Sequence, residues 1–214
     1  MRIAVRRCLR LTVRGLDYPN RDGEWAFLPS ADSTQESYQP DLMKPNPRYF
    51  KLLDDIIPLA ASLGITVWLT PTWGRYINGG YYGSPLLWDE KTAHSFGLFL
   101  GERYPFHPYV LGGDSVRYWN EKTLAHIKDG KDPRELEVKD FGPISEAMAQ
   151  GLIAGEKKAI AGLDQVDRTS NYKTFITFHS AQGELRQQRC IHWLTHSLAR
   201  IGSGSVIIGT IPQC

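Results

Sequence analysis

The chain has 214 residues, of which 42% are hydrophobic and 22% are charged, and its formal net charge is +2. This length and composition are ordinary for one globular domain with a sizeable core, so we treat residues 1–214 as a single domain. A nearly balanced charge gives no reason to expect a nucleic-acid partner, and no apolar run is long enough to predict a membrane span.

The chain starts with a basic segment, in which five arginines and no acidic residue occupy the first sixteen positions. Its apolar residues never form a run long enough for a secretory signal, so we expect a basic edge strand or a disordered start. Residues 15–43 follow, rich in Asp, Asn, Pro, Ser and Gly and without helical periodicity. They predict a long functional loop that is packed by Trp25, Phe27 and Tyr38.

A first helix is predicted from Asn46 as N-cap and Pro47 as first helical residue to Gly64, a C-terminal glycine. Pro58 lies inside this pattern and should kink the helix. Asp54 and Asp55 are expected on its solvated face. The apolar residues that follow helical spacing are Tyr49, Leu52, Leu53, Ile56, Ile57 and Ala60.

The next elements are a buried strand at Ile65–Leu69 and a loop, Pro71–Trp88, that is rich in aromatic residues and glycine. Asp89 should cap a second helix that ends before Pro105. The apolar face of this helix is predicted to contain Ala93, Phe96, Phe99 and Leu100.

A second short strand, Tyr109–Leu111, is followed by two glycines and then by Asp114. Ser115–Lys139 is a polar stretch that we expect to form an excursion from the fold. A third helix is predicted at Pro143–Ala154, and a third strand, Thr174–Phe178, delivers His179 at its end. The expected apolar face of the third helix comprises Ile144, Ala147, Met148 and Leu152.

The alternation of strands and helices predicts an α/β fold with a parallel sheet. In a (β/α) barrel the loop after each strand carries the chemistry, and Asp114 lies where a catalytic acid at a strand end would be. We therefore predict a partial (β/α)8 TIM barrel with three to five strands, which lacks leading and trailing strands.

Seven short motifs, in order and with plausible gaps, resemble those of the apiosidase-like glycoside hydrolases. They cover roughly residues 15–183. The motifs are Gly15-Leu16-Asp17-Tyr18-Pro19-Asn20, Lys44-Pro45-Asn46-Pro47-Arg48-Tyr49-Phe50, Leu69-Thr70-Pro71-Thr72-Trp73-Gly74, Gly101-Glu102-Arg103-Tyr104, Leu111-Gly112-Gly113-Asp114, Met148-Ala149-Gln150-Gly151-Leu152 and Ile176-Thr177-Phe178-His179.

The resemblance implies a retaining glycosidase on a TIM barrel that acts on side chains of plant-type polysaccharides. Asp114 would be the general acid/base, and a glutamate later in the chain would be the nucleophile. Asn20, Trp73 and His179 would bind the substrate, so the implied partner is a carbohydrate and no cofactor is needed. Relatives with both ends intact look secreted, whereas no signal peptide is visible here, so the compartment is left open.

The chain departs from the family pattern at both ends. Only residues 1–14 precede the first motif, and after Gly183 the only carboxylate is Glu184, which is too early for the strand of the nucleophile. We therefore expect a fragment with a divergent tail at residues 184–214, altered by truncation, mis-splicing or a frameshift. Such a chain should be marginally stable and, without its nucleophile, inactive.

Each candidate residue also has a structural alternative. Asp114 could cap a turn, Trp73 could pack under its loop, His179 could be a hydrogen-bonded structural histidine, and Asn20 suits a turn. The whole chain could correspondingly be a non-catalytic carbohydrate-binding or degenerate fragment.

A metal-dependent barrel hydrolase is a further alternative. It would need several converging ligands, and no His-x-His or His-Glu-x-x-His motif is present. Cys8, Cys190 and Cys214 have neither zinc nor redox spacing, so no metal site is predicted, and nothing in the sequence sets the oligomeric state.

Overall fold

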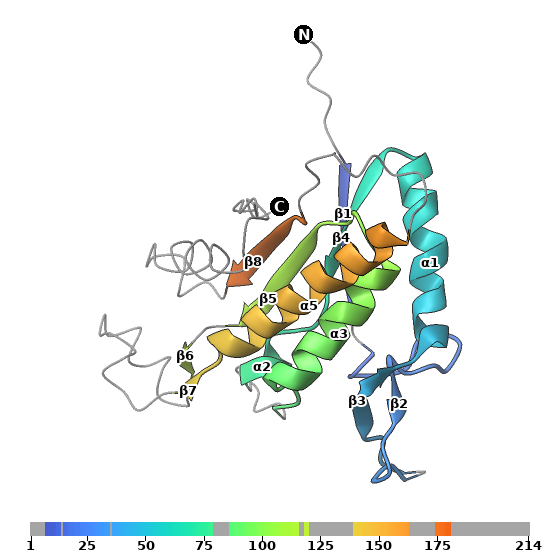
Figure 1. Ribbon diagram of the computed structural model, residues 1–214. Helices are drawn as coiled ribbons and strands as arrows, with labels where there is room; N and C mark the ends of the chain where they lie inside the picture. The colour runs from blue at the N-terminus through green and yellow to red at the C-terminus, as the bar shows by residue number, and fades with distance from the viewer. Residues whose placement is uncertain are drawn as a thin grey trace.

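A computed structural model describes residues 7–13, 15–34, 36–78, 86–115, 118–119, 139–162 and 174–180. Its elements are shown in Figure 1. In chain order they are β1 (Arg7–Thr12), β2 (Phe27–Pro29), β3 (Pro40–Pro45), α1 (Pro47–Ser62), β4 (Ile65–Thr70), α2 (Arg75–Asn78), α3 (Glu90–Arg103), β5 (Tyr109–Ser115), β6 (Tyr118–Trp119), β7 (Lys139–Asp140), α5 (Gly142–Ala161) and β8 (Ile176–Ser180).

The central feature is a parallel sheet of four strands in the order β1-β4-β5-β8. This order follows the chain, and α1, α3 and α5 provide the connections between successive strands. The predicted parallel α/β architecture is confirmed, and β1 is the predicted basic strand at an edge of the sheet. Among the described residues the sheet is open rather than closed into a barrel, with β1 and β8 as its outer strands.

The ends of α1 form as the sequence predicts. The Asn46 side chain accepts a hydrogen bond from the backbone N–H of Arg48 at 3.1 Å, and Gly64 adopts a φ of +68°, which favours glycine. The buried face consists of Phe50, Ile57 and Ala60. The prediction was wrong for Leu52, which is 46% exposed, because the helix turns Phe50 to the core instead.

Helix α3 begins with a capping box between Asp89 and Thr92. The hydrogen bond from the backbone N–H of Thr92, at 2.7 Å, lowers the pKa of the Asp89 carboxyl. The predicted apolar face is confirmed, since Ala93, Phe96 and Leu100 are buried and Phe99 is partly buried against the core.

Helices α3 and α5 lie side by side over the sheet, as Figure 1 shows. Four glycines let their backbones touch. A Cβ at Gly97 or Gly101 would lie 2.3 or 2.1 Å from a carbonyl oxygen of α5, and one at Gly151 or Gly155 would lie 2.1 or 2.2 Å from one of α3. The apolar face of α5 is confirmed, and the helix runs on past the predicted end at Ala154 to Ala161.

The segment predicted as a loop over residues 15–43 contains the antiparallel pair β2 and β3, so that prediction was wrong in part. Trp25 stacks on Tyr38 with 3.9 Å between ring centroids, and the Tyr38 hydroxyl donates to the carbonyl of Phe27 at 2.9 Å. Burial raises the pKa of Tyr38 to about 12. The predicted aromatic packing of this segment is therefore present.

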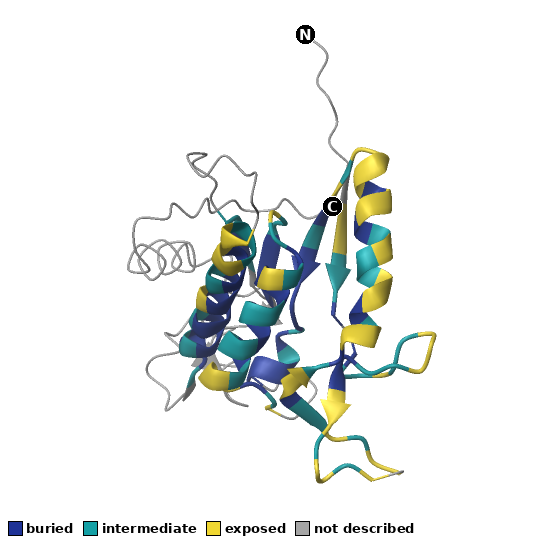
Figure 2. Ribbon diagram, turned by 45° about the vertical axis from the view of Figure 1, so that its right-hand side comes forward, coloured by how far each residue is buried: buried dark blue, intermediate teal, exposed yellow. Residues whose placement is uncertain are grey.

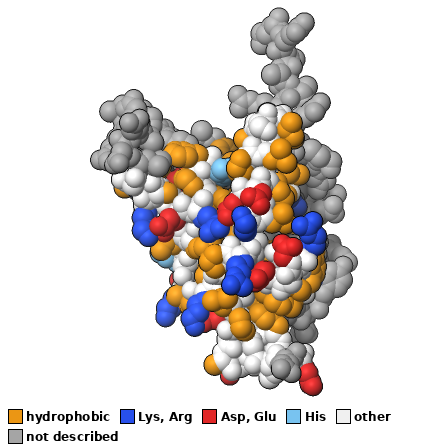
Figure 3. Space-filling model, turned by 90° about the vertical axis from the view of Figure 1, so that its right-hand side faces the viewer, with side chains coloured by type: hydrophobic (Ala, Val, Ile, Leu, Met, Phe, Trp, Pro, Cys, Tyr) orange, Lys and Arg blue, Asp and Glu red, His pale blue; other side chains and the backbone are white. Residues whose placement is uncertain are grey.

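Asp54 was expected to be solvated, and the structure bears this out only in part, because its side chain is 36% exposed but also engaged by α3 and the residue after it. Its carboxylate contacts Arg103 at 3.0 and 2.6 Å and accepts a hydrogen bond from the Tyr104 hydroxyl at 3.0 Å. The hydrogen bond to Asp54 raises the pKa of Arg103, and burial raises that of Tyr104. Asp55 is exposed, as predicted. Figure 3 shows acidic and basic side chains interspersed on the face of the molecule that includes α1.

Figure 2 shows buried residues, in dark blue, in the strands of the sheet and in the helices that pack on it, and these residues form the hydrophobic core. An aromatic cluster occupies this core, with 4.9 Å between the ring centroids of Phe27 and Phe96 and 5.3 Å between those of Trp88 and Phe96. Much of the aromatic content is therefore structural. Among the described helices, none combines the length and the apolar character that crossing a bilayer requires.

Candidate functional site

The carboxyl ends of the four parallel strands lie at one edge of the sheet, which we call the carboxyl edge. Asp114 and His179 both lie inside strands, in β5 and β8, whereas the sequence placed them just after shorter ones. Trp73 follows β4, and the segment that contains Asn20 follows β1. All four predicted site residues thus belong to segments at this edge, where (β/α) folds carry their chemistry.

A bulge in β5 sets the position of Asp114. Leu111 pairs with Phe178 and Ser115 pairs with Ser180, so β5 advances four residues while β8 advances two. Gly112 adopts a φ of +89° at this point, a conformation that L side chains rarely adopt. The left-handed conformation gives the Gly-Gly sequence a structural reason. The bulge leaves three residues of β5, Gly112 to Asp114, opposite the single residue His179 of β8.

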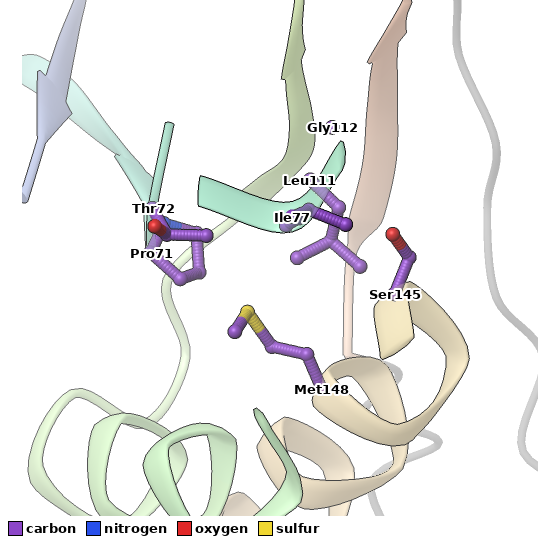
Figure 4. A pocket seen from close by; sticks show the side chains of 7 residues that line it. All are labelled: Pro71, Thr72, Ile77, Leu111, Gly112, Ser145 and Met148. Carbon is purple, nitrogen blue, oxygen red and sulfur yellow. The ribbon is translucent and has the colours of Figure 1, made fainter. Parts of the chain in front are cut away.

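A small hollow lies beneath the carboxyl edge. The space between its atoms is about 190 Å³ when space open to solvent is included, and it encloses no room for a water molecule. In Figure 4, Met148 and Ser145 of α5 point toward residues at the ends of β4 and β5. None of the side chains around the hollow is charged. The lining residues are Pro71, Thr72, Ile77, Leu111, Gly112, Ser145 and Met148.

Trp73 extends from the same loop as Pro71 and Thr72. It is only partly buried and packs against the hydrophobic core. The loop is held by the indole N–H of Trp88, which donates to the Thr72 hydroxyl at 2.9 Å. Trp73 consequently has both a packed part and an exposed part, as a ring that stacks on a ligand needs.

An ion pair that the sequence analysis missed joins the loops after β1 and β4. Arg75 donates to the carboxylate of Asp17, and also to the hydroxyl of Tyr76 at 2.8 Å. The Asp17 side chain is 10% exposed, so this carboxylate is largely withdrawn from solvent. The sequence contains only a weak signal for this ion pair. Asp17 lies in the Gly-Leu-Asp-Tyr-Pro-Asn motif, but its partner lies 58 residues away.

Asn20 has a turn-forming role. Its side-chain oxygen accepts hydrogen bonds from the backbone N–H groups of Asp22 at 3.0 Å and Glu24 at 2.9 Å. The Asn46 amide reaches the same turn, donating to the Glu24 carboxylate at 2.8 Å and the Trp25 carbonyl at 3.0 Å. These hydrogen bonds connect the motif that contains Asn20 with the motif that contains Asn46. A role of Asn20 in sugar binding stays a prediction.

The segments at this edge thus contain Asp114, His179 and Trp73, together with the Asp17–Arg75 ion pair. Together these groups can transfer a proton, stack on a flat apolar face and fix the loops that surround a ligand. Among the described residues, no three or more His, Cys, Asp or Glu side chains are grouped as metal ligands would be. Glu184, which the sequence analysis judged too early for the strand of the nucleophile, lies outside the described residues.

Comparison with known proteins points to one family. The family model described as "Apiosidase-like, catalytic domain" matches residues 12–199. The matched range begins and ends somewhat beyond residues 15–183, which the short motifs cover, and it contains all four predicted site residues. No curated protein matches the sequence.

Proposed function

The chain belongs to the apiosidase-like catalytic-domain family, and we propose that it acts on carbohydrate as a glycoside hydrolase of the retaining type. One observation carries the proposal. The bulge of β5 places three residues, Gly112 to Asp114, opposite the single residue His179 of β8, at the edge of the sheet where barrel enzymes carry their chemistry. The substrate class that the family suggests is the side chain of a plant-type polysaccharide.

The strand order supports the partial (β/α)8 barrel that this function implies. In a doubly wound sheet the order reverses at a switch point, and the ligand binds there. Here each strand is followed by a helix and then by its neighbour in the sheet, as in consecutive units of a barrel. The four strands would accordingly form a continuous arc of the barrel wall.

Asp114 is the proposed general acid/base. In retaining glycosidases one carboxylic acid protonates the leaving oxygen, and a carboxylate about 5–5.5 Å away attacks the anomeric carbon. Asp114 lies after two glycines, one of them in the left-handed region, so the backbone at this position is specified by the bulge. A residue that only capped a turn would not need to lie within a strand.

Trp73, His179 and Asn20 are the proposed carbohydrate-binding residues. The exposed part of the Trp73 indole would stack on a sugar face, and the His179 imidazole would exchange hydrogen bonds with a hydroxyl near the scissile bond. Asn20 would act mainly by shaping its loop, since its side-chain oxygen is already used in the turn. The ion pair between Asp17 and Arg75 would keep the segments after β1 and β4 together around the ligand.

Binding without efficient hydrolysis is the second candidate function, and it has its own support. Hydrolysis with retention needs two carboxyl groups. Asp17 is engaged by Arg75, and the only carboxylate in the sequence after β8 is Glu184. We therefore propose that the 214-residue chain binds carbohydrate and hydrolyses it poorly unless a second carboxylate is supplied.

The deciding experiment measures hydrolysis and binding on the same set of plant polysaccharides and aryl glycosides. Asp114→Asn is compared with the wild type, and Asp55→Asn, which removes an exposed carboxylate on α1, is the control. If the chain hydrolyses, Asp114→Asn should lose on the order of 100-fold or more in kcat/KM. If it only binds, Trp73→Ala should abolish binding while Asp114→Asn retains it. A wild-type chain that neither hydrolyses nor binds any of these carbohydrates would overturn the proposal.

A further inference from the structure

A second carboxylate is buried at the opposite edge of the sheet, far from the proposed chemistry. Glu156 lies on α5 and is only 1% exposed. One carboxylate oxygen accepts a hydrogen bond from the backbone N–H of Phe106 at 2.6 Å, and the other accepts one from the Thr174 hydroxyl. A buried carboxylate is retained only where it is well satisfied, and both oxygens of Glu156 have a partner.

The two partners precede the two strands that carry the candidate site. Phe106 lies in the connection before Tyr109, where β5 starts, and Thr174 lies just before Ile176, where β8 starts. Between them, the backbone N–H of Tyr109 donates to the carbonyl of Phe175 at 2.9 Å. Glu156 therefore bridges the entries of β5 and β8 at the point where their pairing begins.

The local structure indicates that this bridge is needed. Phe106 adopts a φ of +67°, which residues other than glycine seldom adopt, so its conformation must be held by its surroundings. Close packing at Gly101 brings α3 against α5, because a Cβ there would lie 3.0 Å from the backbone nitrogen of Glu156. The helix contact and the carboxylate together fix where β5 enters the sheet.

We propose that Glu156 is a positioning residue that sets the register of β5 against β8, and thereby the position of Asp114 relative to His179. Only three residue pairs separate the entry from the bulge: Tyr109 with Ile176, Val110 with Thr177, and Leu111 with Phe178. A slip of one residue would shift one strand by about 3.3 Å and turn its side chains to the other face. The consequence for catalysis rests on the proposed function, whereas the register itself does not.

The test uses two variants, one that removes a single hydrogen bond of the bridge and one that weakens both. Thr174→Val removes only the arm to β8, and Glu156→Gln weakens both. Glu102→Gln is the control, because Glu102 is an exposed carboxylate on α3 that pairs with Lys158 at 2.8 Å. Amide hydrogen exchange and cross-strand nuclear Overhauser effects between Val110 and Thr177 and between Leu111 and Phe178 are measured for each variant.

We expect Thr174→Val to accelerate exchange in β8 on the order of tenfold and to weaken the cross-strand contacts, with α1 and α3 unchanged. Glu156→Gln should affect both strands, and Glu102→Gln neither. Wild-type exchange and contacts in Thr174→Val would overturn the proposal. So would exchange that rises uniformly in all elements, because Glu156 would then stabilise the fold without setting the register. If Glu156→Gln does not fold, Thr174→Val still decides.

The same variants separate this inference from the proposed function. Register and exchange are measured without any sugar, so they test the bridge even if the wild type binds none. If the wild type does bind or hydrolyse carbohydrate, Thr174→Val should weaken that activity severalfold and Glu102→Gln should leave it unchanged.

Discussion

The edge of the sheet where the strands begin and the carboxyl edge differ in whether their buried polar groups are hydrogen-bonded. At the edge where the strands begin, the Tyr109 hydroxyl donates to the carbonyls of Leu100 and Tyr104 at 3.1 and 2.8 Å, and Glu156 is bonded through both oxygens. Three buried side-chain atoms have no hydrogen-bond partner among the described residues. Two of them, the hydroxyl of Thr70 and the Nε of Arg75, lie at the carboxyl edge, and the third, the indole nitrogen of Trp68, lies within β4.

Most buried polar groups in proteins are hydrogen-bonded, so the exceptions need a reason. Thr70 ends β4, and Arg75 begins α2, directly after the loop that carries Trp73. The bulge with its left-handed Gly112 lies at the same edge. At the edge where the strands begin, the hydrogen bonds of Tyr109 and Glu156 thus stabilise the fold. The carboxyl edge, where a ligand would bind, has buried polar atoms without a described partner and an irregular backbone. The substitutions below test that difference.

The largest effect is expected where α3 and α5 touch. Gly101→Ala places a methyl group 2.1 Å from the carbonyl oxygen of Leu152, which forces the helices apart near Glu156. We expect a loss of about 3 kcal/mol in the free energy of unfolding, measured by urea denaturation. Gly162→Ala is the control, because its Cβ would meet nothing closer than 3.5 Å. Equal stabilities of the two variants would mean that the helices do not pack in this way.

A smaller but more specific effect is expected at the bulge. Gly112→Ala forces an L residue into a φ of +89° and should reduce the free energy of unfolding by about 1–2 kcal/mol. Gly64→Ala imposes a similar strain at a φ of +68° just after α1, where a Cβ would meet nothing within 4 Å. Both variants should lose similar stability, but only Gly112→Ala should also lose carbohydrate binding. If both variants lost carbohydrate binding to the same extent, the bulge would have no specific role in the binding site.

The sequence predicted those parts of the fold that depend on local pattern. Asn46, Asp89 and Gly64 mark helix ends through capping chemistry that acts within a few residues, and the faces of α3 and α5 follow from their spacing. The position of Asp114 at the carboxyl edge was predictable for a related reason, because parallel strands joined by helices all present their carboxyl ends together.

The remaining features depend on contacts between distant residues, which a single sequence does not display. Asp54 has the same local context as exposed Asp55, yet it meets Arg103 49 residues later. The β2–β3 pair was missed because three prolines, Pro29, Pro40 and Pro45, argue against strands. Glu156 did leave a signal, since it extends the apolar spacing of Met148 and Leu152 by one more turn.

The last prediction compares the two edges with a matched pair of hydroxyl deletions. Tyr109→Phe removes a hydroxyl that is bonded to two carbonyls at the start of β5, and it should reduce the free energy of unfolding by about 1–2 kcal/mol. Thr70→Val removes a buried hydroxyl with no described partner, so its stability should be unchanged or slightly higher. Carbohydrate affinity should show the reverse order, falling in Thr70→Val and staying constant in Tyr109→Phe. If Thr70→Val instead lost as much stability as Tyr109→Phe, the hydroxyl would be bonded within the fold and the contrast between the edges would be wrong. Both substitutions nearly preserve the shape of the side chain and remove one hydroxyl oxygen. Comparing their effects on stability and on carbohydrate affinity therefore shows whether each hydroxyl stabilises the fold or binds the ligand.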